Sequence, residues 1–269
     1  IRENSKVFKK KINDRNVDIS LNDLFELDKK NRATIFNKEK LEKEKKNISK
    51  SKDKSQFKKS KKLSNDIDKL KKTQDELEKK IRAITNHIPN IALDDVPIGK
   101  DEKSNKEIKK IGQLPKFNFQ IKSHYEIGQN LGLMDFDLAT KTSGSRFVFL
   151  KGKLAELERA ISNFMIDIHT KEFGYVEISP PLIVSENTMY GTGQLPKFED
   201  DQFQIKLDTD QKKYLIPTAE VILTNMVRES SVDLNSLPLR FVASTPCFRK
   251  EAGSYGKDTK GMLRQHQFN

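Results

Sequence analysis

A regular spacing of aliphatic residues in the first third of the chain constrains its fold more than any other feature. Apolar positions recur there in alternating steps of four and three, with one polar member, at Leu63, Ile67, Leu70, Gln74, Leu77, Ile81, Ile84 and Ile88. This repeat is typical of a coiled-coil seam, because it keeps one narrow apolar stripe turned toward a partner helix. We therefore predict a helix of about 40 Å, at roughly 1.5 Å per residue.

The partner helix is predicted within the same chain. Residues from Leu21 to about Ser51 are highly charged and carry a sparse helical stripe at Leu24, Leu27, Ile35, Leu41 and Ile48. Two such helices, joined by a turn around residues 50–62, would form an antiparallel hairpin, with another short helix before residue 20. The sequence Ile88-Pro89-Asn90 should end the second helix, because proline cannot continue it.

The turn of this hairpin is predicted to be strongly cationic. The chain has a formal net charge of +12, and 17 lysines stand against 9 acidic residues between Lys38 and Lys80. The turn region carries Asp53 and seven lysines: Lys50, Lys52, Lys54, Lys58, Lys59, Lys61 and Lys62. Such a surface favours a phosphate backbone, which it reads by shape and charge more than by sequence. A coiled coil whose lysines are merely solvated is the alternative.

Composition excludes several kinds of site. Cys247 is the single cysteine, which excludes an intrachain disulfide and a multi-cysteine zinc site. The histidines lack metal-ligand spacing, and the sequence contains no glycine-lysine-serine phosphate loop. The sequence contains no run of 18 apolar residues that would indicate a membrane span, so we expect a cytoplasmic protein without membrane association. Because the chain begins at Ile1 and ends inside an expected strand, we expect it to be a fragment.

Composition also divides the chain. Residues 91–123 have mixed charges with scattered proline and glycine, and we interpret them as a linker between a helical arm at 1–90 and a folded domain at 124–269. In the folded domain, one helical face is predicted to carry Leu154, Leu157, Ile161, Phe164, Met165 and Ile168. Gly174 should end that helix, and a strand should follow as far as Pro180.

The end of the chain, from Phe241 to Asn269, is predicted to be a hairpin of two strands around a glycine-containing loop at 252–262. Alternate residues share a face, so we expect Arg249 and Glu251 on one side, as well as Arg264, His266 and Phe268 on the returning strand. Guanidinium groups match phosphate oxygens, an aromatic face can stack on a purine, and a carboxylate can accept from an exocyclic amine. We interpret the hairpin as half of an ATP site. A surface hairpin with solvated charges is the alternative.

The same residues resemble a known signature. They are similar to motif 2 of class II aminoacyl-tRNA synthetases, in the form that this motif takes in seryl-tRNA synthetases. The matching residues are Phe248-Arg249-Lys250-Glu251-Ala252-Gly253-Ser254, together with Gly261 and Arg264-Gln265-His266-Gln267-Phe268. The strings Gly144-Ser145-Arg146-Phe147 and Gly191-Thr192-Gly193-Gln194-Leu195-Pro196-Lys197-Phe198 also resemble that family, and the helix, strand and prolines of 154–181 resemble motif 1. The resemblance covers nearly the whole chain.

The resemblance implies an α+β protein. An antiparallel coiled-coil arm that binds tRNA would precede a truncated class II domain, in which an antiparallel β-sheet is flanked by helices. The implied activity is that of a serine–tRNA ligase, which forms seryl-adenylate from serine and ATP and transfers the seryl group to tRNA(Ser). The resemblance also implies Mg²⁺ and a homodimer formed through the motif 1 region.

Individual roles follow by correspondence with the family. Arg249 would be the catalytic group, because it would bridge the serine carboxylate and the α-phosphate. The implied ATP-binding residues are Arg249, Lys250, Glu251, Arg264 and Phe268, with Glu251 on the adenine amine, Arg264 on the γ-phosphate and Phe268 on the adenine ring. The implied serine-binding residues are Thr218, Ala219, Glu220 and Arg249, and the tRNA-binding residues are the seven lysines of the turn.

Some alternatives stay open at this point. Threonine and an acid at a helix N-terminus also cap free amides, so Thr218 and Glu220 have a purely structural interpretation. No pair of carboxylates clearly supplies a magnesium site. We expect the family's serine-amine glutamate and motif 3 arginine to lie beyond Asn269. A non-catalytic synthetase-like paralogue that binds RNA is a rival function, and a coiled-coil scaffold with an unrelated domain is another.

Overall fold

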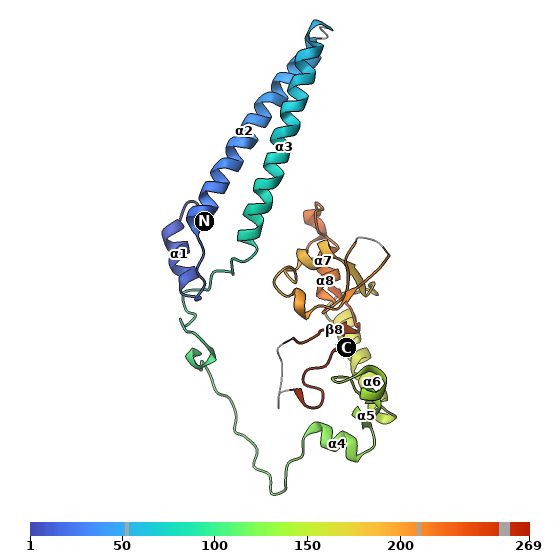
Figure 1. The fold of residues 1–269 in the computed structure, drawn as a ribbon. Coiled ribbons are helices and arrows are strands. Elements are labelled where there is room, and N and C mark those ends of the chain that lie inside the picture. The colour runs from blue at the N-terminus through green and yellow to red at the C-terminus, as the bar shows by residue number, and fades with distance from the viewer. Residues whose placement is uncertain (52–53, 209–210, 253–258) are drawn as a thin grey trace. The chain divides into compact units, whose positions relative to one another are not determined.

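The chain consists of two units in the computed structural model, Ile1–Gln113 and Leu114–Asn269. The structure describes all residues except 52–53, 209–210 and 253–258 (Figure 1). The sequence-based domain limits at residues 90 and 124 stay predictions.

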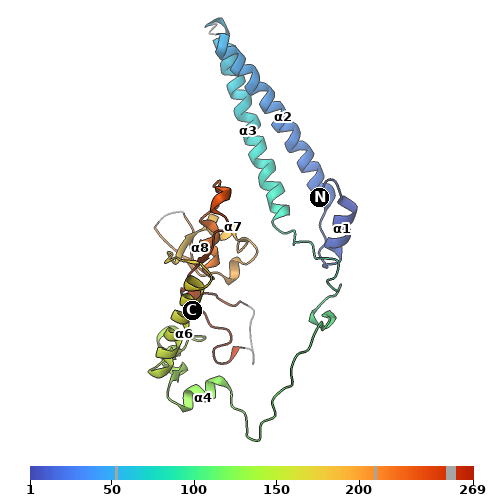
Figure 2. The ribbon, with the colours of Figure 1, turned by 180° about the vertical axis from the view of Figure 1, so that it is seen from behind.

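The first unit is built around the predicted helical hairpin. It contains α1 (Ser5–Asn13), α2 (Leu21–Ser51), the short 3₁₀ helix η1 (Lys54–Gln56), α3 (Phe57–Thr85) and η2 (Glu102–Ser104). Helices α2 and α3 lie side by side along their length (Figures 1 and 2). The polar position in the seam has a partner across the hairpin, because Lys38 Nζ donates to Gln74 Oε1 at 2.7 Å.

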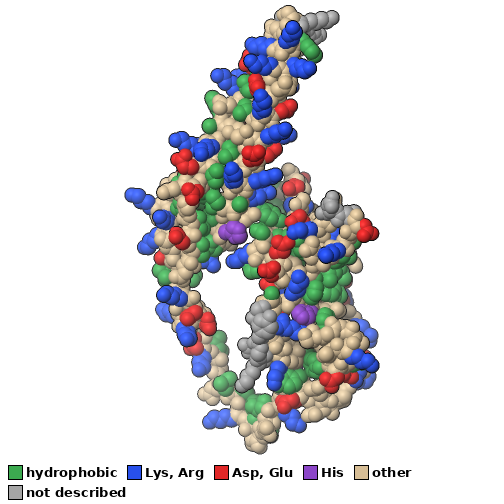
Figure 3. Space-filling view, in the orientation of Figure 1, with side chains coloured by type: hydrophobic (Ala, Val, Ile, Leu, Met, Phe, Trp, Pro, Cys, Tyr) green, Lys and Arg blue, Asp and Glu red, His purple; other side chains and the backbone are tan. Residues whose placement is uncertain are grey.

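The turn is shorter than predicted. Helix α3 begins at Phe57, so Lys58, Lys59, Lys61 and Lys62 lie in its first turns rather than in a loop. These four side chains and Lys50 are exposed, and Lys59 forms an ion pair with Glu44 at 2.8 Å. Lys52 and the side chain of Lys54 lie outside the described residues. Lys and Arg side chains project along the arm as far as the region around its end (Figure 3).

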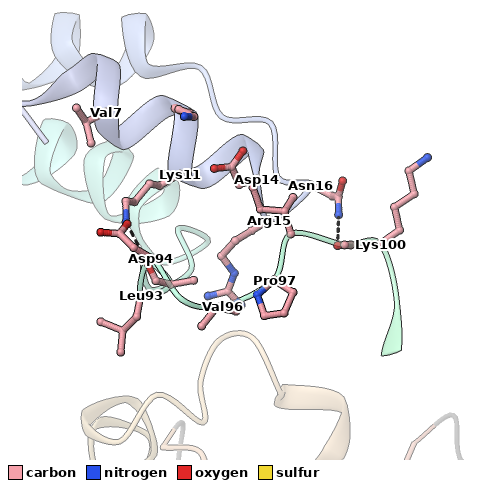
Figure 4. A pocket seen from close by; sticks show the side chains of 14 residues that line it. Val7, Lys11, Asp14, Arg15, Asn16, Leu93, Asp94, Val96, Pro97 and Lys100 are labelled. Carbon is pink, nitrogen blue, oxygen red and sulfur yellow. Dashed lines mark hydrogen bonds and ion pairs between the residues drawn. The ribbon is translucent and has the colours of Figure 1, made fainter. Parts of the chain in front are cut away.

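A small apolar cluster closes the base of the arm. Phe8 and Ile12 of α1 pack with Leu21 and Leu24 of α2, and Ile81, Ile84 and Ile88 complete the cluster. The segment from Asn90 to Gly99 then crosses α1 as a strap, beside a cavity of about 790 Å³ (Figure 4). Three residues of α1 and the turn after it hold the strap: Lys11 pairs with Asp94, Arg15 donates to the Asn90 carbonyl, and Asn16 donates to the Gly99 carbonyl.

The Lys11–Asp94 ion pair is expected to hold the strap only above a certain pH. The hydrogen bond from Lys11 and the charge of its ammonium group lower the pKa of Asp94. A carboxylate with a lowered pKa stabilises the folded state above its unfolded pKa and loses that effect as the pH falls through the folded value. Asp94 is exposed and Lys11 is partly exposed, so the ion pair is screened by solvent, and we expect Asp94→Asn to speed amide exchange of the strap about twofold at neutral pH. The difference should vanish in acid, and Asp95→Asn is the matched control. Equal exchange in wild type and Asp94→Asn at neutral pH would contradict this role.

Among its described residues, the second unit combines helices with four small sheets. Its helices are α4 (His124–Asn130), α5 (Phe136–Ser143), α6 (Lys153–Lys171), α7 (Glu186–Gly191), η3 (Glu199–Asp201), α8 (Glu220–Asn225) and η4 (Leu234–Ser236). Antiparallel pairing joins β1 (Met134–Asp135) to β2 (Phe149–Leu150), β4 (Ile183–Ser185) and β5 (Gln204–Ile205) to the central β6 (Lys213–Leu215), and β8 (Cys247–Phe248) to β9 (Gln267–Phe268). The pair of β3 (Val176–Glu177) and β7 (Phe241–Val242) is parallel.

The core of the second unit surrounds β6. Tyr214 and Ile216 are fully buried and pack with Met189 of α7, Val221 of α8, Val184 and Leu195. The Tyr214 hydroxyl donates to Glu199 Oε1 at 3.3 Å, and burial raises the pKa of this tyrosine. Leu195 belongs to the Gly191–Phe198 string, so that string supplies part of the core.

Helix α6 has the predicted apolar stripe, but most of it is not covered. Leu157, Ile161, Phe164 and Met165 are 43 to 63% exposed. In the part of the chain that the structure describes, no helix combines the length and apolar character that crossing a membrane requires.

Candidate active site

The β8–β9 hairpin lies directly against the end of β6. Cys247 is opposite Phe268 and Phe248 is opposite Gln267. On its other side, the Phe248 N–H donates to the Ile216 carbonyl at 2.8 Å. The Arg249 N–H donates to the His266 carbonyl at 3.0 Å and extends the pairing by one residue. Backbone hydrogen bonds therefore join β8 to β9 on one side and to the residue that follows β6 on the other.

The strands of this hairpin are shorter than predicted, for a reason that the structure makes plain. Glu251 has a φ of 50°, which takes the chain out of the extended conformation. Its carbonyl accepts from Arg146 Nη1 at 2.9 Å, and the Lys250 N–H donates to the Asp201 carbonyl at 2.9 Å. The Glu251 carbonyl, which would continue the pairing with the returning strand, is thus bound by Arg146, and the outward-facing Lys250 N–H is bound by Asp201.

Arg249 is held between an aromatic ring and a backbone carbonyl. Its guanidinium carbon lies 5.1 Å from the centre of the Phe268 ring. Its Nε donates to the Pro217 carbonyl at 3.1 Å. These contacts orient the guanidinium through Nε and the ring face, and none of the described residues is hydrogen-bonded to its two terminal nitrogens. Two of the predicted ATP residues are therefore adjacent, and Arg249 also touches the residue directly before Thr218.

Glu251 and Arg264 form an ion pair, with Arg264 Nη1 3.2 Å from Glu251 Oε2. The Glu251 side chain is 14% exposed and that of Arg264 is 52% exposed. Lys250 is exposed and joins the site through its backbone N–H. His266 Nδ1 is 3.0 Å from the Arg249 carbonyl, and its ring contacts those of Phe147 and Phe203.

The predicted serine-binding residues are divided between a cavity and the surface. Thr218 and Ala219 line a mainly apolar cavity of about 670 Å³ together with Phe268 and residues of α6. Glu220 is exposed, and its N–H donates to Thr218 Oγ1 at 3.3 Å. Thr218 Oγ1 therefore binds one free amide at the start of α8, while the N-cap residue Ala219 makes no side-chain cap.

The described carboxylates do not form a metal site. Outside residues 52–53, 209–210 and 253–258, no three His, Cys, Asp or Glu side chains come close enough together to hold a metal ion. Glu251, the one carboxylate among the predicted ATP-binding residues, is paired with Arg264.

Three residues at the site were not predicted from the sequence. Asp201 and Arg146 bind the backbone where the first strand ends, and His124 Nε2 accepts from the Met262 N–H at 2.8 Å on the returning side. Each comes from a different segment. Gly144-Ser145-Arg146-Phe147 was noted as a string similar to the family, which was a signal for Arg146. No local pattern pointed to Asp201 or His124.

Comparison with known proteins defines the class first. Residues 203–269 match the tRNA synthetase class II core domain (G, H, P, S and T), and residues 1–92 match the seryl-tRNA synthetase N-terminal domain. The chain thus combines a class II synthetase core with a helical arm.

Individual relatives define the family. The chain is 60% identical over 269 residues to a serine–tRNA ligase from Pelagibacter ubique (strain HTCC1062), and it spans 64% of the length of that relative. A crystal structure of seryl-tRNA synthetase from Pyrococcus horikoshii, complexed with ATP, has a TM-score of 0.79 and 31% identity over 99% of this chain and 66% of the other. A cytoplasmic serine–tRNA ligase from Naegleria fowleri, in complex with AMP, has a TM-score of 0.77 and 28% identity over 98% and 61% of the two chains. The chain belongs to the seryl-tRNA synthetase family.

Proposed function

We propose that the full-length protein containing this chain is an ATP-dependent serine–tRNA ligase. The observation that carries the proposal is the position of Arg249, stacked on Phe268 and bonded through Nε to Pro217. This arrangement brings the residues proposed for ATP next to Thr218 and Ala219, which are proposed for serine. The ATP and AMP complexes of the two homologous enzymes support a nucleotide as the ligand.

Arg249 acts as an electrostatic bridge in the proposed reaction. The serine carboxylate attacks the α-phosphorus of ATP, so two anions must approach in line, and pyrophosphate leaves. The terminal nitrogens of Arg249 donate to both anions while Pro217 and Phe268 keep the guanidinium from turning. A preorientated cation of this kind stabilises the charge that develops in the transition state without reorganising.

Glu251 and Arg264 are proposed to bind opposite ends of ATP, the adenine amine and the γ-phosphate. Because they are 3.2 Å apart, both roles are compatible if the triphosphate bends back toward the base or if the ion pair opens. Arg264 is the more exposed partner and therefore the one that moves more easily. Lys250, which is exposed, is proposed to add positive charge near the phosphates.

Selection of serine is proposed to depend on Thr218, Ala219 and Glu220, with Arg249 on the carboxylate. A pocket that hydrogen-bonds the serine hydroxyl discriminates strongly against alanine and glycine, because those substrates leave buried polar groups unpaired. Threonine must be excluded by shape. The Thr218 hydroxyl already accepts from the Glu220 N–H, so its own hydrogen remains to be donated.

Mg²⁺ is expected to accompany ATP as an ion bound to phosphate oxygens. The described carboxylates of this chain do not fit a dedicated magnesium site, since none of them gather in a group of three and Glu251 is paired. We therefore assign no step to the ion.

The arm and helix α6 indicate the proposed partners. The exposed lysines around the start of α3 favour the phosphate backbone of tRNA(Ser). The exposed apolar stripe of α6, in the region that resembles motif 1, favours a second copy of this chain and hence a homodimer. A role in protein synthesis is consistent with the cytoplasmic location that we propose.

Serine-dependent exchange of labelled pyrophosphate into ATP tests the proposed activity. The full-length protein is expected to catalyse this exchange with serine and not with alanine, glycine or threonine, because adenylate formation is reversible. Absence of exchange with any of the amino acids would favour the non-catalytic RNA-binding paralogue. Exchange with a different amino acid instead would support an aminoacyl-tRNA synthetase but would overturn serine as its substrate.

A further inference from the structure

One aspartate outside the hairpin binds the point where its first strand ends. The Ala252 N–H donates to Asp201 Oδ1 at 2.8 Å, and the Lys250 N–H donates to the Asp201 carbonyl at 2.9 Å. The side chain of Asp201 therefore binds the Ala252 amide and its backbone carbonyl binds the Lys250 amide, on either side of Glu251. None of the proposed roles in binding ATP or serine uses this residue.

Asp201 itself is firmly supported. It ends η3, where its N–H donates to the Phe198 carbonyl at 3.1 Å. Glu199 of the same turn accepts from Lys212 Nζ at 3.0 Å and from the buried Tyr214 hydroxyl at 3.3 Å. The hydrogen bond from Lys212 lowers the pKa of Glu199, so the carboxylate stays charged and the turn stays tied to β6. Asp201 is thus held in a fixed position from which it can bind the hairpin.

A histidine binds the returning side of the same hairpin. His124 Nε2 accepts from the Met262 N–H at 2.8 Å. The approach is so close that a Cβ on Gly261 would lie 2.3 Å from His124 Nε2 and 2.8 Å from Tyr125 Cδ1. Gly261 also has a φ of 68°, a conformation that favours glycine. The glycine is therefore required by the contact with His124 and Tyr125.

His124 is also held in place by its own helix. It is the first residue of α4, where Ser123 and Glu126 form a capping box: Glu126 Oε2 accepts from the Ser123 N–H at 2.7 Å, and the Glu126 N–H donates to Ser123 Oγ. The hydrogen bonds from Ser123 lower the pKa of Glu126, with smaller contributions from the charges of Lys122 and Lys260.

We propose that Asp201 and His124 are positioning residues that clamp the two ends of the hairpin connection, at Ala252 and at Met262, and thereby set the spacing between Glu251 and Arg264. Glu251 directly precedes the first clamp, and Arg264 follows the second by two residues. With both ends fixed, the carboxylate and the guanidinium meet at 3.2 Å before any ligand arrives. The inference rests on the proposed function, because its consequence is the binding of ATP by that pair.

Paired substitutions in the full-length protein test the clamp. Asp201→Ala and His124→Ala remove the side-chain acceptors for the Ala252 and Met262 amides, whereas Asp201→Asn and His124→Gln keep an oxygen at a similar reach. Asp200→Ala and His87→Ala are the matched controls. We expect the two alanine variants to speed amide exchange at Ala252 and Met262, respectively, about tenfold. They should also raise the KM for ATP in pyrophosphate exchange about fivefold while leaving the KM for serine unchanged. The Asn and Gln variants should behave like wild type.

The outcomes separate this inference from the proposed function. Normal exchange of pyrophosphate by wild type, with unaltered KM for ATP in Asp201→Ala and His124→Ala, would overturn the positioning role alone. Equal losses in Asp201→Asn and Asp201→Ala would overturn it too, since the charge and not the acceptor would then matter. A wild-type protein that activates no amino acid would instead overturn the proposed function, while amide exchange would still report whether the clamp exists.

Discussion

Replacing Arg249 with alanine in the full-length protein is expected to slow serine-dependent pyrophosphate exchange at least tenfold, and about a hundredfold if Arg249 meets both anions. The reason lies in how the side chain is held. Its Nε is bonded to Pro217 at 3.1 Å and its guanidinium lies over Phe268 at 5.1 Å. Alanine removes the cation and leaves the carboxylate and the α-phosphate to repel each other.

Two further variants make this result specific. Arg249→Lys keeps the charge but loses the Nε contact and the planar fork, so its rate should fall between those of wild type and Arg249→Ala. Arg240→Ala removes an exposed guanidinium of the same unit, which contacts the Phe173 carbonyl at 3.4 Å, and should leave exchange unchanged. An unchanged rate in Arg249→Ala, with normal thermal unfolding, would refute the catalytic role.

The arm was predictable because its pattern is local. A repeat of four and three predicts both a helix and its buried face, and Leu63, the first member of the seam, is 7% exposed. The start of α3 at Phe57 was not predicted, because the seam marks only residues that contact α2. Charged residues ahead of Leu63 continue the helix without adding to the apolar pattern.

The hairpin was predictable only in part. A strand period of two predicted which residues are candidates for one face, and the structure brings Arg249 and Phe268 together. The strand period did not predict where the strands end, because the ends depend on contacts between distant segments. Ala252 and Asp201 are 51 residues apart, Arg146 and Glu251 are 105 apart, and His124 and Met262 are 138 apart. Contacts at such separations leave no periodic trace in one sequence.

Neutralising the lysines at the start of α3 is expected to weaken the binding of tRNA(Ser) transcripts about tenfold at physiological salt. Lys58, Lys61 and Lys62 are exposed, and no ion pair involves them among the residues that the structure describes. Lys59 already forms an ion pair with Glu44 at 2.8 Å, and the carboxylate offsets part of the attraction of Lys59 for a phosphate. The triple variant Lys58→Gln, Lys61→Gln, Lys62→Gln should therefore lose far more affinity than Lys59→Gln. The slope of log K against log salt should become shallower by about 2 to 3.

A second triple variant separates a local contact from a general effect of net charge. Lys72→Gln, Lys79→Gln, Lys80→Gln makes the same change in charge on exposed residues of the same helix, farther from the turn. If the lysines near the turn touch phosphates, this control keeps most of the affinity and nearly the full salt slope, because released counterions are counted per contact. Equal losses in the two triple variants would mean that the arm attracts RNA only through its overall charge. Binding that ignores both sets would place the tRNA contact elsewhere on the protein.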